Sequence, residues 1–274
     1  MQQIRSRKIE RKEIFEYEFS VCTLVTDLSE YEEMKASFVV SGFTENICEF
    51  LYVDNSKQNT FEAFGGLNRF LREARGKYII LCHQDILINH HNIGDLRERI
   101  GEIEQADPNW ALLGNAGGVN LKYTAMNVIQ GTGNLLEDKH LPIKTVTLDE
   151  NFIIVKSAAN LALSADLQGF HMYGTDICLI ADVLGYSSYA IDFKLMHKSD
   201  GNADDTFYQL KKDLIKKYRR AFRSRFLGTT ITRFYISGVR LFNFFGNIAL
   251  VLFLVRQYTK IFKPKKGYRL KLKT

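Results

Sequence analysis

The sequence has 274 residues, 46% of them hydrophobic and 25% charged, and a net charge of +6. This length allows a sizeable core, in one large domain with an appendage or in two modest domains, and the composition excludes a disordered chain. The four cysteines form no CxxC pair and no Cys/His zinc spacing, so we expect buried free thiols in a reducing compartment. The charged N-terminus lacks the apolar segment of a secretory signal.

The N-terminal half alternates between strand and helix patterns. Apolar runs predict strands over 18–26, 47–53 and 78–82, and periodic apolar residues predict a helix that begins near Ser29 and another over 60–75. A β-α-β-α-β series implies a parallel sheet with right-handed crossovers. We therefore expect an α/β fold.

Polar residues follow two of these strands at the point where each strand ends. Asp54-Asn55-Ser56 follows the second strand, and His83-Gln84-Asp85 follows the third. Because ligands of open α/β sheets bind outside the carboxyl ends of the strands, these groups could hold a nucleotide and a divalent metal. The alternative for His-Gln-Asp is a turn with an exposed acid.

Gly65 and Gly66 are poor helix formers near the start of the helix predicted over 60–75. Either a bulky ligand approaches the backbone there, or the helix begins later. The remaining patterns predict a helix over 93–105, strands over 111–113 and 146–155, a helix from Asp176 to Gly185, a strand over 189–195 and a helix over 205–222. By themselves, Asp176 is typical of a helix cap and His197 of a structural histidine.

Four blocks of the sequence, in this order, resemble the glycosyltransferases of the GT-A fold, specifically the family 2-like nucleotide-sugar transferases. The blocks are 53–56, 78–85, 148–150, and 169–179 followed by His197. The pattern is closest to the branch in which His-Gln-Asp replaces the usual Asp-X-Asp, and which also shows Phe-His-X-Tyr-Gly-X-Asp (170–176) and His-X-Ser (197–199). The resemblance implies a three-layer GT-A domain over 18–222, with a mostly parallel central sheet.

The resemblance also implies a donor site for a nucleotide-sugar. Its residues would be Thr26, Asp54, Asn55, Gly65, Gly66, Asn68, His83, Gln84 and Asp85. Among these, Asp54 would contact the base, and Asp85 with His197 would hold a divalent cation, Mg²⁺ or Mn²⁺. The departure from the family pattern is His83, which stands in place of an acid that usually binds ribose.

On the acceptor side, the resemblance implies Asp176 as the catalytic base and a sugar and acceptor pocket formed by Asp149, Glu150, His171 and Tyr173. One positioned base and no protein nucleophile imply a single displacement with inversion. The acceptor would be a carbohydrate or a lipid-linked molecule, as in the synthesis of cell-surface polysaccharide or glycolipid.

The sequence leaves one alternative function open and disfavours another. A catalytically silent GT-A-like scaffold is the alternative that the substitution at His83 keeps open. A nucleotidyltransferase is disfavoured, because the residues after the first predicted strand, 27–30, lack a glycine-rich basic loop for a triphosphate.

The residues after 222 form a basic, apolar extension that the patterns predict to be helical. After Leu214 there are sixteen Lys and Arg and no acid, which leaves 21 bases against 31 acids in the remainder. The apolar stretch 241–255 is shorter than the ~20 residues that span a bilayer. We therefore expect a cytoplasmic protein held peripherally on the anionic inner face of the cell membrane.

The alternative for this extension is packing on the catalytic domain or on a second copy of the chain, which leaves a homo-oligomer open. We expect no nucleic-acid partner, because the aromatic residues form one apolar run instead of alternating with bases.

Overall fold

The computed structural model describes residues 14–199 and 204–263, which form two compact units with a boundary between Lys212 and Asp213. Each unit is described by itself. The charged N-terminal residues and the basic residues after Lys263, on which the predictions about the termini partly depend, lie outside the described residues.

The first unit is built on a seven-stranded sheet. Its strands follow the order β2 (Cys48–Asp54), β1 (Tyr17–Val25), β3 (Gly76–Cys82), β10 (Phe152–Lys156), β5 (Trp110–Gly114), β11 (Ser187–Ala190) and β9 (Ile143–Thr145). Five strands run in one direction, whereas β10 and β9 run in the opposite direction. The predicted α/β fold with a mostly parallel sheet is confirmed.

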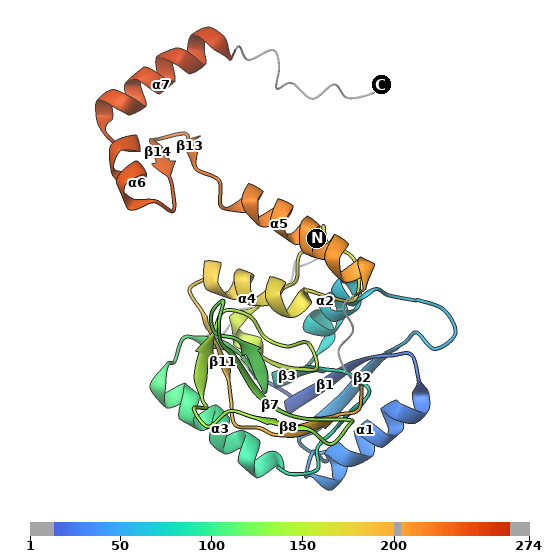
Figure 1. Ribbon diagram of the computed structural model, residues 1–274. Coiled ribbons are helices and arrows are strands. Elements are labelled where there is room, and N and C mark those ends of the chain that lie inside the picture. Colours follow the sequence, from blue (N-terminus) through green and yellow to red (C-terminus); the bar gives the residue numbers. More distant parts are fainter. Residues whose placement is uncertain (1–13, 200–203, 264–274) are drawn as a thin grey trace, which may run out of the picture. The chain divides into compact units, whose positions relative to one another are not determined.

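Helices cover both faces of this sheet and give three layers (Figure 1). Helices α1 (Leu28–Val40) and α3 (Ile93–Ala106) lie on one face, and α2 (Ala63–Glu73) and α4 (Tyr173–Val183) on the other. The inner strands β3, β10 and β5 are buried on both faces because alternate residues meet opposite layers. The four cysteines are buried and free, as predicted.

The helix starts follow local side-chain chemistry. Asp27 caps α1, since its carboxylate accepts from the backbone N–H groups of Ser29 and Glu30. Glu62 caps α2 in the same way, so this helix begins three residues later than predicted. Gly66 then lies in its first turn and faces Leu24, where an added Cβ would be 2.6 Å from a side-chain carbon. Close packing of helix on strand therefore requires this glycine.

A second, smaller sheet was not predicted from the sequence. It has the order β4 (Ile86–Leu87), β12 (Leu195–His197), β7 (Thr124–Gln130) and β6 (Ala116–Gly118), and β8 (Leu135–Glu137) pairs with β7. Strand β7 pairs with its sequence neighbours β6 and β8, but β4 and β12 have only two and three residues and come from distant parts of the chain, so no local pattern identifies their pairing.

Two predicted strands are wrong in part. The first half of 146–155 leaves the central sheet, and the backbone N–H groups of Val146 and Asp149 donate to Gly118 and Ala116 instead. The strand predicted over 189–195 ends at Ala190, and the chain resumes as β12 in the smaller sheet. A short 3₁₀ turn, η1 (Ser157–Ala159), follows β10.

Helix α5 (Asp205–Ala221) crosses the boundary and leads into the second unit. This unit contains a hairpin, β13 (Arg225–Gly228) with β14 (Arg233–Ile236), and the helices α6 (Arg240–Gly246) and α7 (Ala249–Phe262) (Figure 1). Among the described residues no single helix is long and apolar enough to cross a membrane. Helices α6 and α7 pass that test together, but they are bent by 71°.

Candidate active site

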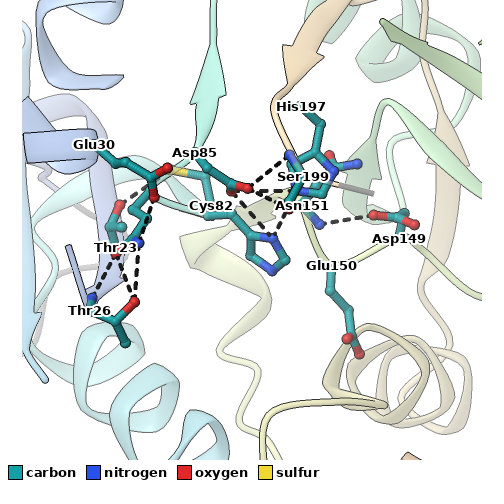
Figure 2. A network of polar contacts seen from close by, with 12 residues as sticks. Thr23, Thr26, Glu30, Cys82, Asp85, Asp149, Glu150, Asn151, His197 and Ser199 are labelled. Carbon is teal, nitrogen blue, oxygen red and sulfur yellow. Dashed lines mark hydrogen bonds and ion pairs between the residues drawn. The ribbon is translucent and has the colours of Figure 1, made fainter. Parts of the chain in front are cut away.

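Three side chains meet at the carboxyl edge of the central sheet: His83, Asp85 and His197, called here the His-Asp-His cluster. His83 Nδ1 lies 3.3 Å from His197 Nε2 and 4.0 Å from Asp85 Oδ1. His197 Nε2 lies 3.4 Å from the same carboxylate oxygen. Figure 2 shows Asp85 and His197 pointing toward each other from different strands.

Strand pairing explains why these residues meet. His83 follows β3, where its backbone N–H donates to the carbonyl of Asn151 at the start of the antiparallel strand β10. In the smaller sheet, His197 pairs directly with Ile86. The backbone N–H of Lys198 also donates to the carbonyl of Asp85, at 3.0 Å. Residues from distant parts of the chain thus face each other across one ladder.

Ser199 orients the carboxylate of Asp85. Its hydroxyl donates to Oδ2 of Asp85 at 2.5 Å, and its backbone N–H lies 3.3 Å from the same oxygen. Oδ1 is left facing the two histidines. Burial would raise the pKa of Asp85, but the hydrogen bonds from His197 and Ser199 outweigh it and hold the pKa well below its usual range. Asp85 is therefore a carboxylate at neutral pH.

Tyr173 orients the ring of His83. The tyrosine hydroxyl donates its single proton to the carbonyl of Glu150 at 3.0 Å, and it also lies 2.9 Å from His83 Nε2. Because that proton is already used, Nε2 of His83 must be the donor in the second bond. The neutral ring then carries its lone pair on Nδ1, the atom that faces Asp85 and His197. Burial, and next the charge of His197, lower the pKa of His83 and favour this neutral form.

Gln84, the middle residue of the motif, holds the neighbouring strand end. Its Oε1 accepts from the backbone N–H groups of Thr26 at 2.6 Å and Asp27 at 3.0 Å. Its Nε2 donates to Glu30 at 2.9 Å. These bonds occupy the amide, so Gln84 ties the end of β3 to the start of α1.

A cavity of about 270 Å³ opens beside the cluster. Its wall combines the ends of β1 and β3 with α2 and the segment before α4, and it includes Thr26, Glu30, Ala63, Leu67 and Phe170. The lining combines apolar side chains with His83 and Asp85 of the cluster. This combination suits an organic ligand with a charged group.

Two residues predicted to bind the nucleotide-sugar donor do not line this cavity. Asp54 lies exposed at the end of β2, where Ser56 donates to its carboxylate and holds the pKa of Asp54 below its ordinary value. Asn55 is buried, and its amide bonds the backbone of Thr60 and Phe61. Asn55 therefore shapes the loop that leads to α2.

Gly65 and Asn68 line a second cavity, of about 600 Å³, between α2 and the segment 160–168. The amide of Asn68 donates to the carbonyl of Leu163 and accepts from its N–H, like a short strand pair. The structure therefore separates these residues from the His-Asp-His cluster, whose cavity they do not line.

The adjacent acids at 149 and 150 have different surroundings. Asp149 is exposed and accepts from the backbone N–H of Asn151 at 3.0 Å. Its negative charge raises the pKa of His83 and so opposes the effect of burial on that ring. Glu150 extends away from the cluster in Figure 2 and accepts from the N–H of Gly174 at 3.1 Å. Burial, and then the charge of Asp149, raise the pKa of Glu150 to about 8.

Asp176 and His171 are held by structural contacts. Asp176 has no exposed surface, and Ser164 donates to its two carboxylate oxygens from the backbone N–H at 2.8 Å and from the hydroxyl at 2.7 Å. An acceptor hydroxyl has no route to these oxygens in this arrangement. The ring of His171 packs edge-on against Phe207, with centroids 5.5 Å apart.

Replacing Asp176 by asparagine should destabilise the first unit. The amide group would present donors where Ser164 also donates, and one buried polar group would lose its partner. We expect a loss of about 1–3 kcal/mol in the free energy of unfolding, measured by urea denaturation. A variant as stable as the wild type would show that the Ser164 bonds contribute nothing to folding.

The fold is that of the GT-A glycosyltransferases. The mannosyltransferase PcManGT from Pyrobaculum calidifontis, solved with GDP-Man and Mn²⁺, aligns with 80% of this chain and 69% of its own at a TM-score of 0.50 and 12% identity. S. aureus TarS aligns with 93% of this chain and 46% of its own at a TM-score of 0.49 and 15% identity. The fold assignment depends on the first alignment.

The chain belongs to the family of the "ATP synthase subunits region ORF 6" protein of Fuscovulum blasticum. The two sequences are 37% identical over 226 residues, which are 80% of this chain and 91% of that protein. No protein-family model matches the sequence.

Two residues of the site were not assigned these roles from the sequence. Ser199 is part of the His-X-Ser motif, and its spacing from His197 was the signal that could have identified it. Tyr173 was predicted on the acceptor side, but it is buried and contacts His83. No local pattern indicates that contact, because 90 residues separate the two side chains.

Proposed function

We propose that the protein transfers a sugar from a nucleotide-diphosphate donor to an acceptor hydroxyl, with inversion at the anomeric carbon. The observation that carries the proposal is the His-Asp-His cluster, which faces a cavity at the carboxyl edge of a GT-A sheet. Ligands bind at this edge in open α/β folds. The similar mannosyltransferase was solved with GDP-Man and Mn²⁺, which supports a donor and a cation of this class.

His83, Asp85 and His197 would hold the cation. Their ligand atoms are 3.3 to 4.0 Å apart, close to the spacing of about 3.0–3.4 Å expected for neighbouring ligands at bond lengths of about 2.1 Å. Two imidazoles and one carboxylate favour Mn²⁺ over Mg²⁺, because Mg²⁺ prefers oxygen ligands. When bound, the cation would neutralise the negative charge that develops on the leaving diphosphate.

Asp149 is the residue we assign as catalytic base. In the transfer, the acceptor oxygen forms a bond to the anomeric carbon while the bond from that carbon to the diphosphate oxygen breaks. The acceptor proton passes to a carboxylate, and the electron pair leaves with the nucleoside diphosphate. Asp149 is exposed, and its charge acts on the ring of His83, whereas Asp176, the base implied by the resemblance, is fully enclosed. The acceptor would be a hydroxyl of a carbohydrate or of a lipid-linked sugar.

A ligand-detected NMR screen tests this function. GDP- and UDP-sugars would be added to the protein with Mn²⁺, with Mg²⁺ and with EDTA. We expect one nucleotide-sugar to bind in the presence of Mn²⁺, and we expect this binding to be lost when EDTA is added. The absence of metal-dependent binding for every donor would overturn the proposal. Donor binding without sugar transfer to any acceptor tested would instead support a catalytically silent GT-A-like scaffold.

Tyr173 should be needed for metal affinity although it does not contact the ion. In Tyr173→Phe, Nε2 of His83 loses its acceptor, so the proton distributes between the two ring nitrogens and Nδ1 is less often free. We expect about tenfold weaker Mn²⁺ binding by calorimetry, the lower end of the range for such outer-shell partners.

Long-range ¹⁵N–¹H correlations on histidine-labelled, metal-free protein provide a direct readout of this effect. They should show the Nε2–H tautomer of His83 in the wild type and a mixture in Tyr173→Phe. Phe222→Leu, at an exposed aromatic residue, is the matched control and should change neither property. A wild-type ring protonated at Nδ1 would contradict the assignment.

A further inference from the structure

The C-terminal unit exposes large apolar side chains on two consecutive helices. Between 222 and 263, which the structure describes throughout, only Gly246 is buried. Phe244 in α6 keeps 68% of its surface exposed, and Leu250 and Phe253 in α7 keep 64% and 54%. Soluble proteins rarely leave so much apolar surface in water, so a partner must cover it.

Two polar side chains of the same unit bond to its own backbone. The side-chain amide of Asn247 donates to the carbonyl of Tyr235 at 2.9 Å and accepts from its N–H at 2.9 Å. Asn243 accepts from the N–H of Ser237. Helix α6 also packs closely on β14, since a Cβ at Gly246 would lie 2.2 Å from the ring of Tyr235. The two asparagines that interrupt the apolar run are therefore paired within the unit.

This pairing gives both asparagine side chains hydrogen-bond partners within the unit. It satisfies the condition that hydrocarbon imposes, because polar groups in lipid must find their partners inside the protein. The apolar start of α7, 249–255, covers about 10 Å of helix, which reaches into one leaflet of a ~30 Å hydrocarbon core. Arg256 and Lys260 follow it, where headgroups would lie.

The charge of the unit distinguishes between partners. Sixteen Lys and Arg and no acid follow Leu214. A second copy of the unit would bring like charges together with Asp213 as the one acid to pair with them, whereas an anionic lipid surface complements them.

We propose that the C-terminal unit is embedded in one leaflet of an anionic membrane, with Phe244, Leu250 and Phe253 among the lipid chains. The basic side chains lie at the headgroups, and Asn243 and Asn247 remain paired to the hairpin. This inference does not depend on the proposed sugar transfer, because it involves other residues and another ligand.

Tryptophan quenching by brominated lipid tests the insertion in the full chain. The single native tryptophan, Trp110, is fully buried in the first unit and gives a constant background. In Phe253→Trp, we expect vesicles of brominated phosphatidylglycerol to quench the new emission, and brominated phosphatidylcholine vesicles to need roughly tenfold more lipid. Val40→Trp, at a residue of α1 that is 88% exposed, is the matched control and should not be quenched.

Equal quenching of Phe253→Trp and Val40→Trp, or quenching of neither, would overturn the proposal. The double variant Leu250→Asp/Leu254→Asp should lose sedimentation with the anionic vesicles, while Val40→Asp keeps it, and circular dichroism would show that all variants stay folded. The wild type could instead fail to bind vesicles and sediment as a dimer, with the double variant sedimenting as a monomer. In that case a second copy covers this surface and the membrane assignment is wrong.

Discussion

Asp85→Asn should weaken Mn²⁺ binding by about a hundredfold or more, the upper end of the effects seen at metal sites. Asp85 supplies the negative charge among the three ligand residues of the cluster, and it is almost buried. An asparagine cannot replace it, because its oxygen would serve either Ser199 or the metal. With the oxygen on Ser199, the NH₂ group would take the position of Oδ1 between His83 and His197, and an amide NH₂ cannot bind a cation. Calorimetry with Mn²⁺ measures the loss.

Asp182→Asn is the matched control for this variant. Asp182 is an exposed acid of α4 and takes no part in the cluster, so its neutralisation should leave Mn²⁺ affinity unchanged. Nucleotide-sugar binding by Asp85→Asn should fall to the level of the wild type in EDTA. If Asp85→Asn binds Mn²⁺ as tightly as the wild type, the cation is held elsewhere and the cluster has another role.

Asp149→Asn should reduce transfer by about 10²–10⁴-fold, the range for removal of a general base. The amide is close in size to the carboxylate but cannot take the acceptor proton. The side chain is exposed and accepts a hydrogen bond from the backbone N–H of Asn151, which an amide oxygen can also accept. We therefore expect donor binding, Mn²⁺ binding and the unfolding midpoint to stay near the wild-type values. Turnover of the donor identified in the binding screen measures the loss.

Asp176→Asn provides the comparison that distinguishes the two candidate bases. Assayed per folded protein, below its unfolding midpoint, it should keep most of its turnover, because Ser164 holds the native carboxylate away from the cavity. The opposite result, in which Asp149→Asn stays active and folded Asp176→Asn is inactive while it still binds donor, would return the base to Asp176. Loss of donor binding in both variants would argue against a base role for either.

The sequence was sufficient to predict the α/β alternation and the polar strand ends. The spacing of apolar residues within one segment indicates which face of a strand or helix is buried. This spacing can be read without knowing which distant segments the face contacts. The His-Gln-Asp motif was found for the same reason, since its three residues directly follow a buried strand. The prediction for 146–155 failed in its first half because the backbone of Val146 and Asp149 bonds to β6, a contact between separate segments that the local pattern does not report.

Tertiary structure alone decided how the site is assembled. His197 faces Asp85 because β12 pairs with the two-residue strand β4, a ladder too short to leave a periodic pattern. In the same way, the contact of Tyr173 with His83 and the enclosure of Asp176 by Ser164 depend on how separate segments pack. The sequence by itself therefore determined which chemical groups stand at the strand ends. Long-range strand register and packing decided which of them face one another, because those terms depend on residues far away in the chain.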